Sequence, residues 1–135
     1  MTLTHEALHC VSVGFVRNDY EQAPGWEEGV VEQMQRLLRP RVLARLSVSV
    51  PPQVIDDADA SHSFNRHIVA LEEIREAVQA EKMSFYLRLL QTPIKGRIGA
   101  VLAEMRALSG DERSKFVRVF AKSNATLKEK LQWID

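Results

Sequence analysis

The fold of this chain is decided by residues 64–90, which read FNRHIVALEEIREAVQAEKMSFYLRLL. In the first half of this stretch the apolar residues recur every three or four positions, at Phe64, Ile68, Leu71, Ile74 and Val78. That spacing places them on one face of an amphipathic helix. We therefore predict a long helix from Ser61 or Ser63 to about Leu90, with a break near Glu81 to Ser84.

The second half of the stretch is apolar on nearly every side of a helix. Its hydrophobic residues are Met83, Phe85, Tyr86, Leu87, Leu89 and Leu90. Such a helix must be covered either by the core of its own domain or by a partner. Aromatic residues and methionine are also frequent at the centres of protein interfaces. Both interpretations stay open, and the candidate interface residues are Met83, Phe85, Tyr86, Leu89 and Leu90.

Residues 25–38 carry a second helical pattern. The apolar side chains of its inner face are Trp26, Val30, Met34 and Leu37. Pro40 is expected to end this helix, because proline disfavours helical geometry at the residue before it.

Further helix starts lie in the C-terminal part of the chain. Thr92 followed by Pro93 is typical of a first helical turn. Ser109 with Glu112 forms a capping box for another helix. Together the helical patterns predict a mostly α fold with four to five helices.

Two segments near the N-terminus favour strands instead. Residues 42–50 alternate between the two sides of a strand, with one side formed by Val42, Ala44, Leu46, Val48 and Val50. Residues 9–16 alternate in the same way, although a helix starting at Thr4 competes. If these segments pair, they add a short two-stranded β element, which brings the fold to the margin of α+β. Its open edges would suit a homodimer formed by sheet extension, with Leu46 and Val48 at the interface.

The length of 135 residues suits one domain, and no linker divides the chain. We therefore predict a single domain over residues 1–135, with a strand-helix-strand part at 1–60 and a helical part at 61–135. The 18 basic and 18 acidic side chains give a net charge of +0. No stretch approaches the roughly 20 apolar residues that cross a bilayer. The single cysteine, Cys10, cannot form an internal disulfide, so we expect a cytoplasmic protein without membrane contact.

Residues 5–9 read HEALH, which fits the pattern H-E-x-x-H. On a helix, this spacing directs two imidazoles at one zinc ion while the glutamate activates a water molecule. A working site needs a third protein ligand, and His62 or His67 could supply it only through the tertiary fold. The β-branched run that begins at Val11 argues against a rigid helix here. We therefore expect a chance match with no metal and no cofactor, and we keep a zinc hydrolase as a remote alternative.

Four arginines follow one another without an acidic residue between them, at Arg36, Arg39, Arg41 and Arg45. Arginines that share a face can neutralise the phosphates of a nucleic acid. More often such a group is a solvated face. A nucleic-acid-binding regulatory protein is therefore the second hypothesis for function.

The first hypothesis is a non-enzymatic helical module that regulates another intracellular protein, such as an anti-activator of a transcription factor, an adaptor or a chaperone. It would act by burying the region of Phe85, Tyr86 and Leu89, or the segment around Leu46 and Val48, against its partner. No catalytic residue is expected. A homodimer is the expected assembly.

Overall fold

The structure of the chain is a computed structural model that describes residues 2–130. These residues form eight α-helices and one short 3₁₀ helix, and they contain no strand. The elements are α1 (Thr2–Val11), α2 (Arg17–Gln22), α3 (Gly25–Arg45), α4 (Pro52–Ala60), α5 (Asn65–Val78), α6 (Lys82–Leu90), α7 (Ile94–Glu104), η1 (Met105–Ala107) and α8 (Gly110–Lys128). The prediction of a mostly α fold is confirmed. The predicted number of four to five helices is wrong, and so is the two-stranded β element.

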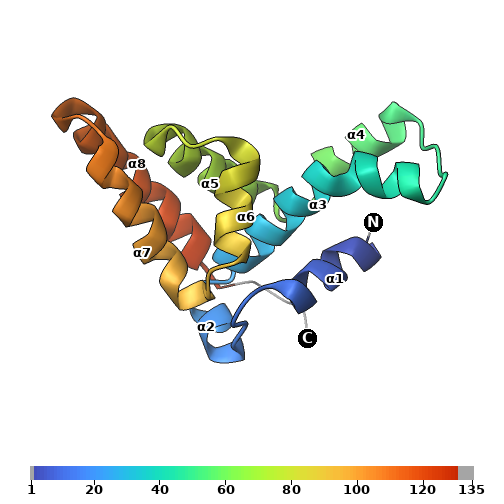
Figure 1. The fold of residues 1–135 in the computed structure, drawn as a ribbon, viewed down its shortest axis with the longest axis horizontal. Helices are drawn as coiled ribbons and strands as arrows, with labels where there is room; N and C mark the ends of the chain where they lie inside the picture. Colours follow the sequence, from blue (N-terminus) through green and yellow to red (C-terminus); the bar gives the residue numbers. More distant parts are fainter. Residues whose placement is uncertain (1, 131–135) are drawn as a thin grey trace.

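Helix α3 is the central element, and its first half is surrounded by α1, α5, α6, α7 and α8 (Figure 1). Trp26, Val30 and Val31 in this half are fully buried. The second half of α3 extends away from the other helices and is followed by α4, which folds back beside it (Figure 1). We call residues 36–60 the α3–α4 arm. The core therefore lies at one end of α3, and the arm projects from it.

The predicted break in the long helix is present, a few residues earlier than expected. Helix α5 ends at Val78, and Gln79 turns the chain with a left-handed backbone at φ 59°. The side chain of Glu81 then accepts hydrogen bonds from the backbone N–H groups of Met83 and Ser84, and this caps α6. The break lets α5 and α6 cover different sides of α3.

The C-terminal helix starts where its capping box predicts. Ser109 accepts a hydrogen bond from the backbone N–H of Glu112, and the Glu112 side chain accepts one from the backbone N–H of Ser109. From there α8 runs without interruption through Lys128.

Residues 42–50 do not form the predicted strand. Helix α3 continues to Arg45, and the chain then reverses at Ser47, whose φ is 54°. A strand needs a second strand for its backbone hydrogen bonds, whereas a helix satisfies them within its own segment. The other candidate, residues 9–16, is also no strand: α1 extends to Val11, and a turn at Gly14 follows. With no partner strand among the described residues, residues 42–45 extend α3, residues 46–50 form a turn and an irregular connection, and only the start of 9–16 is helical.

Pro40 does not end α3, although the sequence predicts that it should. A proline inside a helix removes one backbone hydrogen bond and costs about 3 kcal/mol. Arg39, the residue before it, is held by both carboxylate oxygens of Asp59 on α4, each at 2.8 Å. This contact from outside the helix stabilises helical geometry at the residue that proline disfavours.

Two glycines allow α3 to lie very close to its neighbours. A Cβ atom on Gly25 would come within 2.8 Å of the Cα of Leu127 on α8. A Cβ atom on Gly29 would come within 2.7 Å of the Leu71 side chain on α5. Larger residues would push α5 and α8 away from α3.

Candidate metal centre

Helices α1 and α3 face each other with histidines on one side and glutamates on the other. His5 and His9 lie one helical turn apart on α1. Glu28 and Glu32 have the same spacing on α3, and Glu27 lies beside them. All five side chains are largely shielded from solvent. We call His5, His9, Glu27, Glu28 and Glu32 the His–Glu cluster.

Three side-chain atoms of this cluster converge on one point. The Nε2 atoms of His5 and His9 are 3.1 Å apart. Glu28 Oε1 lies 2.5 Å from Nε2 of His9 and 3.6 Å from Nε2 of His5. This oxygen is buried, and no described residue donates a hydrogen bond of normal geometry to it. A buried carboxylate oxygen in this position needs a positive neighbour, which is either the protonated imidazole of His9 or a bound metal ion.

The opposite nitrogen of each histidine is held by a second carboxylate. His5 Nδ1 lies 3.0 Å from Glu32 Oε1, and His9 Nδ1 lies 2.7 Å from Glu27 Oε2. A carboxylate can only accept, so each Nδ1 carries the proton and donates it. Once the proton on each Nε2 is displaced, the lone pair of that nitrogen can bind a metal. Metal-binding histidines are usually oriented by such a carboxylate, which also makes them stronger ligands.

The glutamates of the cluster favour the protonated, positively charged forms of His5 and His9. Burial lowers the pKa of His5, but its hydrogen bonds with Glu28 and Glu32 outweigh burial and raise this pKa to about 9. The pKa of His9 rises to about 10 in the same way, because Glu27 and Glu28 outweigh burial. Burial raises the pKa of Glu28, but the two histidines lower it further, to about 2. The same carboxylates attract a divalent cation, which competes with protons for the site.

The spacing of the three converging atoms fits a zinc ion. With bonds of about 2.1 Å, the ligand atoms of a tetrahedral site lie about 3.4 Å apart. Two of the separations in the cluster, 3.1 and 3.6 Å, are close to this value, whereas the 2.5 Å between Glu28 Oε1 and His9 Nε2 is the length of a short ion pair and would have to widen around a metal. Two histidines and one carboxylate fill three positions and leave the fourth open, as in catalytic zinc sites.

Glu27 is itself fixed by a buried arginine from a distant helix. Arg97 on α7 has no exposed surface, and its Nη1 donates to Glu27 Oε1 over 2.8 Å. Its Nη2 donates to the Ser12 hydroxyl, which donates in turn to Glu27. Arg97 also donates to the backbone carbonyl oxygens of Trp26 and Thr92. Through Glu27, this arginine determines how His9 is oriented.

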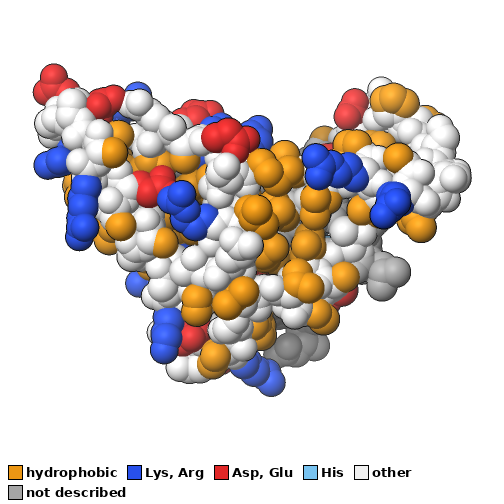
Figure 2. Space-filling model, viewed as in Figure 1, with side chains coloured by type: hydrophobic (Ala, Val, Ile, Leu, Met, Phe, Trp, Pro, Cys, Tyr) orange, Lys and Arg blue, Asp and Glu red, His pale blue; other side chains and the backbone are white. Residues whose placement is uncertain are grey.

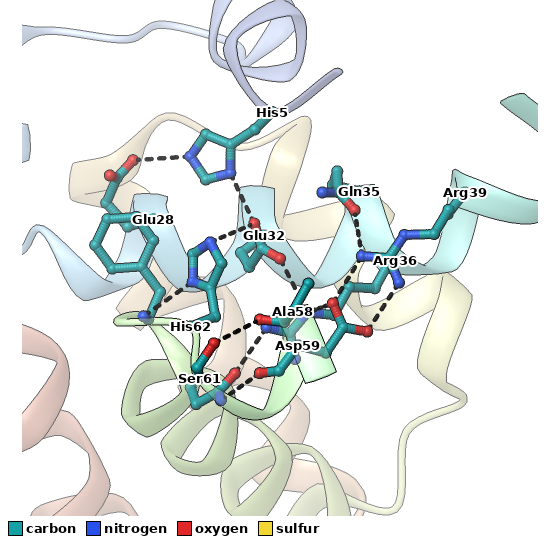
Figure 3. Close-up of polar contacts among 12 residues, drawn as sticks. His5, Glu28, Glu32, Gln35, Arg36, Arg39, Ala58, Asp59, Ser61 and His62 are labelled. Carbon is teal, nitrogen blue, oxygen red and sulfur yellow. Dashed lines mark hydrogen bonds and ion pairs between the residues drawn. The ribbon is translucent and has the colours of Figure 1, made fainter. Parts of the chain in front are cut away.

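Glu32 connects the cluster to the α3–α4 arm (Figure 3). Its carboxylate accepts a hydrogen bond from Arg36, and one of its oxygens lies 3.3 Å from Nε2 of His62. Arg39 pairs with Asp59 next to it. These contacts of Arg36 and Arg39 hold the start of the arm and Asp59 beside the cluster.

A pocket of about 510 Å³ opens beside the cluster, between α1 and the arm. His5, Glu28 and Glu6 line it, so an ion bound at the converging atoms would have its open position near the pocket. Glu6 is exposed, and one of its oxygens lies within 4.8 Å of one ring nitrogen of His5 and one of His9. It therefore occupies the place of the catalytic glutamate in an H-E-x-x-H site.

The predicted interface on α6 lies in the core of the chain. Phe85, Tyr86, Leu89 and Leu90 are buried, and Met83 is half-buried against the same core. Of the two interpretations of this segment, the structure supports the core.

The other predicted interface residues are at the surface. Leu46 is 64% exposed and Val48 is 47% exposed, at the far end of the α3–α4 arm. They flank a turn rather than a strand, so no sheet edge is available for pairing.

The four arginines do not form one free basic face. Arg36 and Arg39 pair with Glu32 and Asp59, whereas Arg41 and Arg45 are exposed. Two of the four arginines are thus neutralised within the chain, which weakens the hypothesis that the chain binds nucleic acid.

The sequence analysis missed the residues that complete the site. Glu27, Glu28, Glu32 and Arg97 were not among its candidates. One signal was present: Glu28 and Glu32 have the same four-residue spacing as His5 and His9, as facing helices require. Comparison of the chain with protein-family models, curated proteins and solved structures gives no match.

Proposed function

We propose that this chain is a zinc-dependent hydrolase of peptide bonds. The observation that carries the proposal is the position of Glu28, whose carboxylate meets the two histidines of the H-E-x-x-H segment and completes a three-ligand set. Two histidines and one glutamate are the ligand set of several zinc peptidases. The sequence alone lacked this third ligand and left the helix in doubt, and α1 is helical over Thr2–Val11.

Each residue of the site has a distinct task. His5, His9 and Glu28 would hold the metal, and Glu27 and Glu32 keep the two imidazoles in the right orientation and tautomer. When bound there, zinc would supply polarisation of the substrate carbonyl and a lowered pKa of water. Glu6 accepts the proton of the attacking water and passes it to the amine that leaves when the C–N bond breaks.

The proposal is tested by zinc binding and by the Glu6→Gln variant. Calorimetry should show one zinc ion per chain. Glu6→Gln should bind zinc as the wild type does, because Glu6 is not a ligand, but its hydrolysis of fluorescein-labelled casein should fall at least about 100-fold. Glu21→Gln, on an exposed part of α2, is the control and should change neither property. A chain that binds no zinc, or a Glu6→Gln variant with full activity, would contradict the proposal.

Exposed apolar side chains support a second candidate, contact with another protein. Leu46 and Val48 are exposed on the arm, and Figure 2 shows further hydrophobic side chains in the notch beside it. A homodimer or a regulatory partner could cover this surface, and light scattering of the purified chain distinguishes a dimer from a monomer. This candidate is compatible with a hydrolase, since a peptidase also binds polypeptides.

Two features of the chain bear on the cellular compartment in which it works. None of the helices in residues 2–130 is long and apolar enough to span a bilayer. The single cysteine, Cys10, is exposed and free. A free thiol suits the reducing cytoplasm, and we propose that compartment.

A further inference from the structure

The pocket beside the His–Glu cluster is polar at one end and apolar at the other. Its polar end contains the histidines and glutamates that lie next to the metal position. Its apolar end is built mostly by the α3–α4 arm, with the side chains of Leu43, Val50, Val54, Ile55 and Phe64. A volume of about 510 Å³ is in the range of pockets that take small molecules or side chains.

The apolar wall begins directly at a proposed metal ligand. The ring of Phe64 stacks on the ring of His5, with 5.9 Å between their centres. His5 and Glu28 line the pocket, whereas His9 and Glu27 do not. If the carbonyl group of a substrate binds at the open metal position, the rest of the substrate extends past Phe64 and along the arm.

The charges that line the pocket do not favour an anion. Four carboxylates face it, from Glu6, Glu28, Glu32 and Asp59. The arginine of the lining, Arg39, donates to both oxygens of Asp59 and is neutralised there. A negatively charged substrate group would find no free guanidinium in the lining, and the exposed carboxylate of Glu6 would repel it.

We propose that the apolar end of this pocket is a specificity site for a bulky, uncharged aliphatic or aromatic side chain beside the bond that is cleaved. This inference rests on the proposed function, because it takes the zinc position as the place of cleavage. The α3–α4 arm then has a defined role, which is to select the substrate. Acidic side chains are disfavoured, because the arginine of the lining is already paired with Asp59 and Glu6 is negatively charged.

Hydroxamates test the pocket without requiring turnover, because their head group binds zinc while their tail can be varied. The zinc-loaded chain is titrated by calorimetry with acetohydroxamate, with isocaproyl hydroxamate and with the monohydroxamate of succinic acid. The branched aliphatic tail should increase affinity at least about tenfold over acetohydroxamate. The acidic tail should lower it.

Val54→Asp is the matching variant, since Val54 lines the pocket and is 55% exposed, so the fold tolerates the change. It should abolish the preference for the aliphatic tail over acetohydroxamate. Val69→Asp is the control, because Val69 is 57% exposed on α5 and does not line the pocket. It should keep the preference.

The outcomes separate the two proposals. If zinc binds and all three hydroxamates bind alike, or if Val54→Asp and Val69→Asp weaken them equally, the specificity site is refuted while the zinc site stands. If the chain takes up no zinc and binds no hydroxamate, the proposed function itself is refuted.

Discussion

Replacing Glu28 by alanine is expected to lower the zinc affinity of the chain by more than about 100-fold. Loss of an outer partner of a metal ligand already costs about 10- to 100-fold, and Glu28 is a ligand itself. Without its carboxylate, His5 and His9 are left as a two-ligand site. Competition with a colorimetric zinc chelator at fixed pH measures the change.

Thermal unfolding gives a second measurement of the same effect. A ligand present at 1,000 times its dissociation constant stabilises the folded state by about 4 kcal/mol. Zinc should therefore raise the melting temperature of the wild type, and it should raise that of Glu28→Ala far less. Glu76→Ala, an exposed glutamate on α5, is the matched control and should behave as the wild type does. Equal zinc affinity in Glu28→Ala and the wild type would show that the convergence of the three side chains is a packing coincidence.

Replacing Arg97 by methionine is expected to lower the free energy of unfolding by about 3–5 kcal/mol. Arg97 and Glu27 are both fully buried, and removing the arginine leaves an uncompensated carboxylate in the core. Burial lowers the pKa of Arg97, and the carboxylate of Glu27 opposes that shift. Methionine fills much of the volume of the arginine side chain, so the loss of unfolding free energy reports mainly on the removed charge. Urea unfolding of the metal-free chain measures it.

Two further variants identify the cause of that loss. Arg118→Met changes an exposed arginine on α8 and should shift stability by no more than about 0.5 kcal/mol. The double variant Arg97→Met with Glu27→Gln removes both charges and should recover part of the loss. A loss below about 1 kcal/mol in Arg97→Met would mean that Glu27 does not depend on this arginine.

Helices α3, α5, α6, α7 and α8 were predictable because their signals are local, whereas the short helices α2 and α4 were not predicted. The apolar stripe from Phe64 to Val78, the break before α6 and the capping box at Ser109 depend on residues a few positions apart. The errors arose where a local pattern was ambiguous. Residues 42–50 alternate as a strand does, yet no second strand exists among the described residues to pair with them.

The candidate site also combines a part that is visible in the sequence with a part that depends on the tertiary structure. The sequence by itself determined one half of the proposed metal centre, because His5 and His9 are four residues apart and a helix alone brings them to one face. Only the tertiary structure decided the other half, since Glu28 comes from another helix and Arg97 from a third. Side chains from separate helices meet only when the whole core fixes how those helices pack, and no spacing along the chain encodes that.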